Sequence, residues 1–458
     1  MFEAGWQALC IFSVKINAMT HRTFWGFPLL LLGLMVPGLK AQIEFTEYTM
    51  DNGLHVILHE NHSTPIVAIS VLYHVGSKNE DTSRTGFAHF FEHLLFEGSK
   101  HIARGEFDKY IQQAGGYNNA NTSQDRTFYF EVLSSNQLEL GLWLESERML
   151  HAKIEEIGLE TQREVVKEEK RLRVDNQPYG SLLEDVFSRA YTQHPYRWVP
   201  IGSMEHLNAA TLEEFMEFYK TFYVPNNATL SIAGDIDIET TKKLVDKYFS
   251  GIPRGTGEIP RPNVVEPKQT KEIRDTVYDE IQLPAVVQAY HIPAQGTEDH
   301  YALQVLSSIL SGGESARFQR VVKNEQEKAL QVFGFPFPLE DPGLFVTLGI
   351  CNMGVDPADL EKAMDEQVER LKNEPVTEKE LQKVINQLET QFVEQNRQMS
   401  GIAENLANYH VYYGEANLIN TELERYRKVS AADVQRVAKQ YFIPQNRVNL
   451  YYLPAPSN

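Results

Sequence analysis

An internal repeat constrains the fold of this chain more than any other feature of its sequence. The segment TPIVAISVLYHVGSKNED contains Pro65, and the similar segment LPAVVQAYHIPAQGTED contains Pro284, which lies 219 positions further along. The segments FYVPNNATLSI and YFIPQNRVNLYYL contain Pro225 and Pro444, which are also 219 positions apart. Two matches at one spacing predict that the chain holds two copies of a single structural unit.

The stretch between the two copies is typical of a linker. With 458 residues, the protein is too long for one ordinary hydrophobic core, which agrees with a division into domains. Residues 251–270 contain four prolines and three glycines without an apolar period, a composition that favours a connecting segment. We therefore predict one domain over residues 42–250 and a second over residues 271–458.

Each predicted domain mixes strands and helices. Asn52-Gly53 predicts a tight turn between two strands, because both residues readily adopt positive φ angles. The apolar patterns predict strands at Ile66–Val75 and Thr127–Leu133, and helices at Gly86–Glu97, Glu106–Ala114, Asn136–Leu150, Glu155–Arg173, Leu212–Phe222 and Ala432–Tyr441. This grouping favours an α+β fold, with a largely antiparallel sheet flanked by helices in each domain, over a doubly wound parallel sheet.

The first 41 residues have the pattern of a secretory signal peptide. Phe24–Leu39 is an uncharged, leucine-rich run that follows Arg22, and Ala41 supplies a small residue before the expected cleavage site. A membrane anchor is the alternative, but Pro28 and Pro37 interrupt the run, which is shorter than the ~20 apolar residues of a bilayer span. We therefore expect an exported protein, with the periplasm as its location.

The composition excludes several classes of function. The chain has 62 acidic against 43 basic residues, a net charge of -19, which argues against nucleic acid or an anionic membrane as the main partner. Cys10 falls within the expected signal, so Cys351 is left without a partner for an internal disulfide. The sequence has no G-x-S-x-G motif and no glycine-rich phosphate loop, so serine, cysteine or phosphate chemistry has no support.

The segment GFAHFFEHLLFEG is the sharpest local signal for chemistry. His89 and His93 are four residues apart, so on a helix they project from one face and can bind one zinc ion. Glu92 lies beside them, where it can accept a proton from a water molecule at the metal. The H-x-x-E-H pattern is rare by chance, and its apolar frame favours a buried helix in which unliganded polar residues would be costly.

A catalytic zinc site needs a third protein ligand, which usually leaves one position open for water. The acidic stretch LETQREVVKEEKRLR offers four candidates, and spacing alone does not choose among them: Glu160, Glu164, Glu168 and Glu169. The alternative interpretation is a solvated charged helix with pairs such as Glu169 with Arg173.

Three further histidines, His55, His59 and His62, cluster near the first predicted hairpin. They could hold a second metal ion. Histidines of this kind are more often ordinary surface and edge-strand residues, which is the interpretation we favour.

Five segments together resemble the M16 (pitrilysin/insulinase) metallopeptidases: HFFEH, REVVKEE, GGYNNANTSQDRTFYF, HPYRWVPIG and FYVPNNATLSIAGD. The resemblance is strongest to the two-domain subgroup that includes mitochondrial processing peptidase and bacterial relatives. It implies two homologous domains of the LuxS/MPP-like metallohydrolase fold and a zinc endopeptidase. It also implies that His89, His93 and Glu169 bind one zinc ion per chain, with Glu92 as general base. One departure is Gln162, where relatives often have a second acidic residue.

The same resemblance implies how a peptide substrate would bind. In the family, the strand that corresponds to Asn119–Val132 is a sheet edge to which the substrate adds as a further strand. Asn119 and Ala120 would then lie near the scissile bond. Backbone pairing of this kind recognises extended shape more than sequence.

The second copy lacks these chemical groups. The position 219 residues beyond Glu169 is Leu388, and the helix expected in HYALQVLSSILSGGES has His300 but no second histidine. Active family members also supply an Arg and a Tyr seven residues apart, whereas the matching stretch RVVKNEQEKALQV has Lys323 and Leu330. We therefore hypothesise a heterodimer in which a homologous subunit supplies that pair, with a homodimer as the alternative.

Two classes of function remain open from the sequence. One is a zinc endopeptidase that hydrolyses short peptides or unfolded polypeptides. The other is a structural or binding homologue that keeps the fold without cutting. The intact HFFEH motif with Glu169 favours the enzyme, because a structural role gives no reason to keep two histidines and a glutamate together on an apolar helix.

Overall fold

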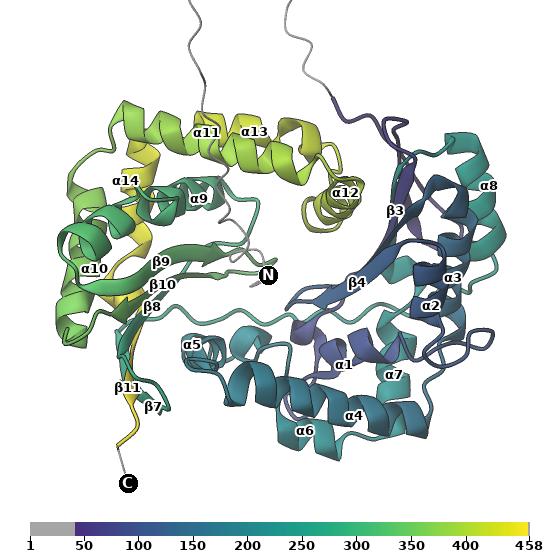
Figure 1. The fold of residues 1–458 in the computed structure, drawn as a ribbon, viewed down its shortest axis with the longest axis horizontal. Helices are drawn as coiled ribbons and strands as arrows, with labels where there is room; N and C mark the ends of the chain where they lie inside the picture. The colour runs from purple at the N-terminus through teal and green to yellow at the C-terminus, as the bar shows by residue number, and fades with distance from the viewer. Residues whose placement is uncertain (1–41, 457–458) are drawn as a thin grey trace, which may run out of the picture. The chain divides into compact units, whose positions relative to one another are not determined.

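The computed structural model describes residues 42–456, so the expected signal peptide, residues 1–41, lies outside the described part of the chain. Within residues 42–456, no helix combines the length and the apolar character needed to cross a bilayer. Two sheets with helices packed against them make up the described fold (Figure 1). The prediction of an α+β fold with two similar domains is confirmed.

The first sheet has six strands in the order β1-β2-β6-β3-β5-β4. The strands are β1 (Thr46–Thr49), β2 (His55–Glu60), β3 (Ile66–Tyr73), β4 (Tyr117–Thr122), β5 (Thr127–Ser134) and β6 (Ala228–Gly234). Only β2 and β6 run parallel, and every other neighbouring pair is antiparallel. β4 therefore forms one edge of the sheet.

The second sheet has five strands in the order β7-β11-β8-β10-β9. The strands are β7 (Ile273–Asp279), β8 (Ala285–His291), β9 (Ala329–Phe337), β10 (Leu344–Cys351) and β11 (Arg447–Pro454). β7 and β11 run parallel, and the other neighbouring pairs are antiparallel. This order reproduces β2-β6-β3-β5-β4 of the first sheet strand by strand.

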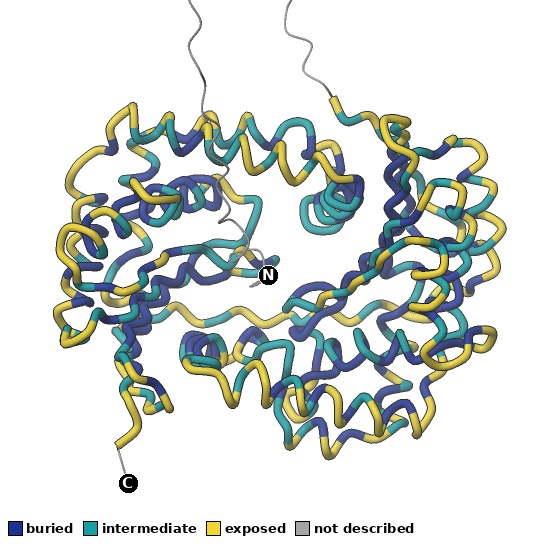
Figure 2. The backbone as a smooth tube through the Cα atoms, viewed as in Figure 1, coloured by how far each residue is buried: buried dark blue, intermediate teal, exposed yellow. Residues whose placement is uncertain are grey.

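Helices pack on the sheets, and inner strands such as β3 and β6 are largely buried, whereas the edge strands β1, β4 and β7 are not (Figure 2). The first half contains α1 (Phe87–Leu94), α2 (Phe107–Gln113), α3 (Leu138–His151), α4 (Glu156–Lys170), α5 (Leu182–Ala190), α6 (Met204–Ala209), α7 (Leu212–Phe222) and α8 (Ile238–Phe249). The second half contains α9 (Glu298–Ser311), α10 (Pro357–Asn373), α11 (Glu378–Gln395), α12 (Met399–Tyr413), α13 (Leu418–Lys428) and α14 (Ala431–Tyr441). The predicted helices are present, but α1 ends at Leu94, earlier than expected.

The repeat is most exact at α7 and α14, the helices that precede β6 and β11. Thr211 caps α7 and Ser430 caps α14, each through a reciprocal capping box, and these two residues are 219 positions apart. The register of the inner strands differs, however. Ala228 lies opposite Tyr73 in the first sheet, whereas Arg447 lies opposite Tyr290 in the second. This shift of two residues keeps the same side chains on the same face of the sheet.

One helix from each half packs on the sheet of the other half. α5 packs on β8 and β11, where Phe187 joins the core of the second sheet. α12 packs on β3 and β6, where Leu406 joins a core with strands of the first sheet (Figure 1). Phe187 and Leu406 are fully buried and are 219 positions apart. The two copies therefore exchange equivalent helices.

The prediction of a tight turn at Asn52-Gly53 needs correction. The connection from β1 to β2 is longer than a two-residue turn: Gly53 has a φ of 90°, but Asn52 does not adopt a positive φ. The Asn52 side chain instead donates to the carbonyls of Phe249 and Ile252, which ties the loop to the end of α8.

The predicted linker, residues 251–270, contains no helix or strand. It is nevertheless held in place. The Arg261 guanidinium contacts the side chain of Asn227, and the Glu266 carboxylate accepts hydrogen bonds from the backbone of residues 192–194. The exact domain boundaries stay a prediction.

Candidate metal centre and active site

The helix α1 carries the H-x-x-E-H motif, and a buried acid fixes its start. Gly86 precedes the helix with a φ of 98° and has no side chain to cap it. The Glu80 carboxyl group takes this role, because it accepts hydrogen bonds of 2.8 Å from the backbone N–H groups of Gly86 and Ala88. Burial raises the pKa of Glu80 to about 8. Sequence reasoning missed this residue, since it lies outside the motif.

His89, His93 and Glu169 come together between α1 and α4. Glu169 Oε2 lies 3.5 Å from His89 Nε2 and 3.2 Å from His93 Nε2. Two ligands about 2.0–2.1 Å from a tetrahedral zinc ion are roughly 3.3 Å apart, so these separations match such a site. Glu169 Oε2 is buried without a well-aligned hydrogen bond, as expected of an oxygen that faces a cation. The donor set therefore fits zinc.

The protonation of these groups also suits a metal. Burial, together with the smaller effect of the neighbouring His93, lowers the pKa of His89 to about 4. For Glu169, burial acts in the opposite direction, but the close contact with His93 Nε2 and the nearby guanidinium of Arg173 lower the pKa to about 2. At neutral pH, His89 is therefore neutral and Glu169 is ionised, which are the forms that bind metals.

Glu92 lies on the same helix but does not belong to the ligand group. Its Oε2 atom accepts a hydrogen bond of 2.7 Å from Thr122 Oγ1, at the end of β4. Burial raises the pKa of Glu92, although this hydrogen bond opposes the effect. Thr122 therefore positions the carboxylate, and this contact could not be predicted from the sequence because the two residues are 30 positions apart along the chain.

The other acidic candidates on α4 form salt bridges instead of facing the two histidines. Three of them pair with basic side chains three residues further along the helix: Glu160 with Arg163, Glu164 with Lys167, and Glu168 with Arg171. Gln162 donates to the Glu97 carboxylate. An acidic side chain at position 162 would face Glu97, so the amide replaces a repulsion with a hydrogen bond.

Asn119 and Ala120 lie on the edge strand β4, opposite Phe130 and Tyr129 of β5. The expectation of a single strand over Asn119–Val132 is wrong. These residues form a hairpin, β4 and β5, which turns at residues 123–126. The polar residues YNNANT therefore form the strand β4, because tertiary pairing overrides their weak strand propensity.

The second half offers no equivalent centre. Lys323 lies in a π-helical turn (Phe318–Glu325), and Leu330 lies on β9 with 47% of its surface exposed. His300 is buried on α9, and burial lowers its pKa to about 4. Among residues 271–456, no group of three histidine, cysteine or acidic side chains is close enough to share a metal ion.

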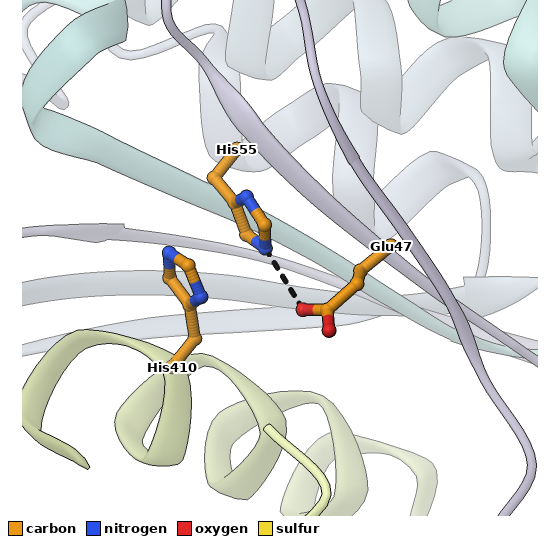
Figure 3. Close-up of side chains that lie close together, drawn as sticks. All are labelled: Glu47, His55 and His410. Atoms are coloured by element: carbon orange, nitrogen blue, oxygen red, sulfur yellow. Dashed lines mark hydrogen bonds and ion pairs between the residues drawn. The ribbon is translucent and has the colours of Figure 1, made fainter. Parts of the chain in front are cut away.

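The histidines near the first hairpin do not gather into one group. His59 Nδ1 lies 2.7 Å from the carbonyl of Glu44, and His62 pairs with Asp235 and Glu60. His55 lies beside Glu47 and His410 (Figure 3). Its ring stacks on that of His410, with centroids 3.5 Å apart and an angle of 2° between the planes.

Comparison with known families identifies the chain. Residues 55–198 match the family described as insulinase (peptidase family M16), and residues 209–388 match the peptidase M16 inactive domain. A zinc protease PqqE from Helicobacter pylori is 32% identical over 409 residues, which cover 89% of this chain and 92% of that protein. The chain belongs to peptidase family M16. The predicted family membership is confirmed.

Two further relatives extend this M16 assignment. The crystal structure of a protease from Helicobacter pylori matches with a TM-score of 0.86 and 31% identity, covering 90% of this chain and all of that one. An Arabidopsis thaliana protein named a probable mitochondrial-processing peptidase subunit beta is 25% identical over 86% of this chain and 75% of its own length. The two-domain architecture is thus shared with other M16 proteins.

Proposed function

We propose that this M16 protein is a zinc-dependent endopeptidase that hydrolyses short peptides or unfolded polypeptides. His89, His93 and Glu169 would hold one catalytic zinc ion. The convergence of Glu169 Oε2 with both imidazole Nε2 atoms, next to Glu92, is the observation that carries the proposal. The relatives named zinc proteases support it.

The remaining chemistry follows from this chain's own residues. When bound, zinc supplies a Lewis acid that polarises a peptide carbonyl and makes water more acidic. Glu92 accepts the proton of the attacking water and then donates it to the departing amine. Thr122 holds Glu92 in place through its 2.7 Å hydrogen bond.

An extended peptide would pair with the free edge of β4. Asn119 and Ala120 would then lie beside the scissile bond. Thr122 links this strand to Glu92, so a peptide on the edge approaches the general base directly.

We also propose that the chain works in a dimer. Leu330 has no polar group to stabilise a developing oxyanion, and Lys323 replaces the expected arginine. A homologous subunit that carries the Arg/Tyr pair would complete the site, and a homodimer is the alternative. The relative named as a subunit supports pairing with a homologue. Nucleic acid is not an expected partner.

Export remains part of the proposal. The signal-like residues 1–41 would direct the chain to the periplasm. Fractionation of cells that express the full chain, followed by N-terminal sequencing, tests this: a mature chain starting near residue 42 is expected, and an uncleaved cytoplasmic chain would contradict it.

The test of the enzyme is peptide cleavage by the wild type and by Glu92→Gln, alone and with a homologue that bears the Arg/Tyr pair. The variant should keep its zinc and lose about 10²–10⁴-fold in kcat. Zinc-loaded wild type that cuts no peptide even with the partner would favour the structural alternative, which the name of the inactive-domain family leaves open.

A further inference from the structure

A second group of potential metal ligands lies where the loop after α1 meets the end of α3. Glu147 and His151 are four residues apart on α3, so their side chains share one face of the helix. His101 reaches them from the loop, and its Nδ1 atom lies 2.8 Å from Glu147 Oε1. One potential ligand atom from each of the three residues lies within 4.8 Å of the others.

Backbone hydrogen bonds hold this arrangement in place without any metal. The N–H of Lys100 donates to the carbonyl of His151 at 2.9 Å, and the N–H of Lys153 donates to the carbonyl of Gly98 at 3.0 Å. The loop and the helix end are therefore joined on both sides of the cluster, which keeps His101 beside α3.

Ser99 orients the carboxylate. Its hydroxyl donates to Glu147 Oε2 at 2.5 Å and accepts from the N–H groups of His101 and Ile102 at 3.2 Å each. The Glu147 side chain is only 7% exposed, so this oxygen is fixed while Oε1 faces the imidazole of His101. Metal-binding carboxylates are commonly held by a second hydrogen bond of this kind.

The ring geometry separates this cluster from the stacked histidines. The rings of His101 and His151 are 5.3 Å apart and nearly perpendicular, at 89°. The rings of His89 and His93 are 4.9 Å apart at 76°, which is a similar arrangement. Perpendicular rings allow the in-plane lone pairs of two imidazoles to converge on one ion.

The parallel rings of His55 and His410 do not allow this (Figure 3). The ring centroids are 3.5 Å apart and the planes are almost parallel, so an ion between the two rings would lie over their faces rather than in either ring plane. The lone pairs lie in the ring planes, so the group of Glu47, His55 and His410 is poorly arranged for a shared metal.

We propose that His101, Glu147 and His151 form a second binding site for a divalent transition-metal ion of the zinc type. Two imidazole nitrogens and one carboxylate oxygen are the ligands that zinc prefers, and water would complete the coordination. The His101 side chain is 51% exposed, so the ion exchanges with solvent. The ion would join the loop after the catalytic helix to α3.

Zinc titration of the metal-free full chain tests the site, with bound zinc counted by mass spectrometry after gel filtration. The wild type should bind two equivalents, the second more weakly. His151→Ala and His101→Ala should each bind one, whereas the control His55→Ala should bind two. Ser99→Ala should weaken the second equivalent by about 10–100-fold, because it removes the bond that orients Glu147.

Two results would overturn the proposal. One is a wild-type chain that binds a single equivalent across the micromolar range, and the other is a second equivalent that persists in both histidine variants. His101→Ala alters an exposed loop residue, so it remains informative even where His151→Ala fails to fold. Glu169→Gln should lose the first equivalent and keep the second, which separates this site from the proposed catalytic one.

Discussion

The two halves of the chain place a helix in the same position and use it for different purposes. In the first half, α1 contacts β4 and α4, and it directs His89 and His93 at Glu169. In the second half, α9 contacts β9 and α11, and it buries Leu306 and Ile309 instead. The two halves therefore share the packing that forms the sheets, whereas the H-x-x-E-H motif is present on α1 and absent from α9.

The largest expected effect concerns the third ligand. Glu169→Gln should abolish tight zinc binding and peptide cleavage, because it removes the only carboxylate of α4 that faces the two imidazoles. Glu168→Gln is the matched control, since Glu168 is exposed and pairs with Arg171. Zinc content and cleavage rate measured on both variants check this. Equal zinc content in the two variants would refute the assignment.

The second comparison concerns what the second half lacks. Installing the missing pair with Lys323→Arg and Leu330→Tyr should raise kcat of the chain alone by about 10²–10³-fold, because the tyrosine can donate to a developing oxyanion. Leu330→Phe with Lys323→Arg is the control, since it adds the ring without the hydroxyl. A folded double variant with unchanged kcat would show that the pair acts elsewhere.

The exchanged helices should contribute to stability to a similar extent. Phe187→Ala and Leu406→Ala each leave a cavity in a core shared by both halves, at a cost of about 3–5 and 2–5 kcal/mol in the free energy of unfolding. Urea denaturation measures both values. A loss below about 1 kcal/mol for either variant would mean that its helix does not pack on the opposite sheet.

The smallest effect tests the most exact part of the repeat. Thr211→Ala and Ser430→Ala should each cost about 0.5–2 kcal/mol, because each removes one side of a capping box at the same place in its half. Clearly unequal losses would indicate that the two helix starts are held by different contacts. Thermal denaturation of the two variants provides the comparison.

Local patterns in the sequence predicted a large part of this architecture. The structure agrees with two of these patterns. The four-residue spacing of His89 and His93 places them on one helix face, and the 219-residue repeat corresponds to packing that both halves share. Choosing Glu169 among four acidic residues required the family resemblance, because several spacings on one helix are compatible with a ligand.

Contacts between segments that are far apart in the chain could not be predicted from the sequence. Thr122 holds Glu92, and Glu80 caps α1, but neither contact produces a periodic pattern in the sequence. The grouping of His101 with Glu147 is similar, since the residues lie 46 positions apart. The edge strand β4 was expected only from the family resemblance, because its polar residues have low strand propensity, and the turn that separates it from β5 was not expected.

The central claim is that the first half alone holds the catalytic metal. Anomalous diffraction at the zinc edge, from crystals of the chain grown with zinc, tests it most directly. We predict a strong peak bounded by His89, His93 and Glu169, and no peak beside α9 or α11. A first half without that peak, or a comparable peak within residues 271–456, would contradict the account.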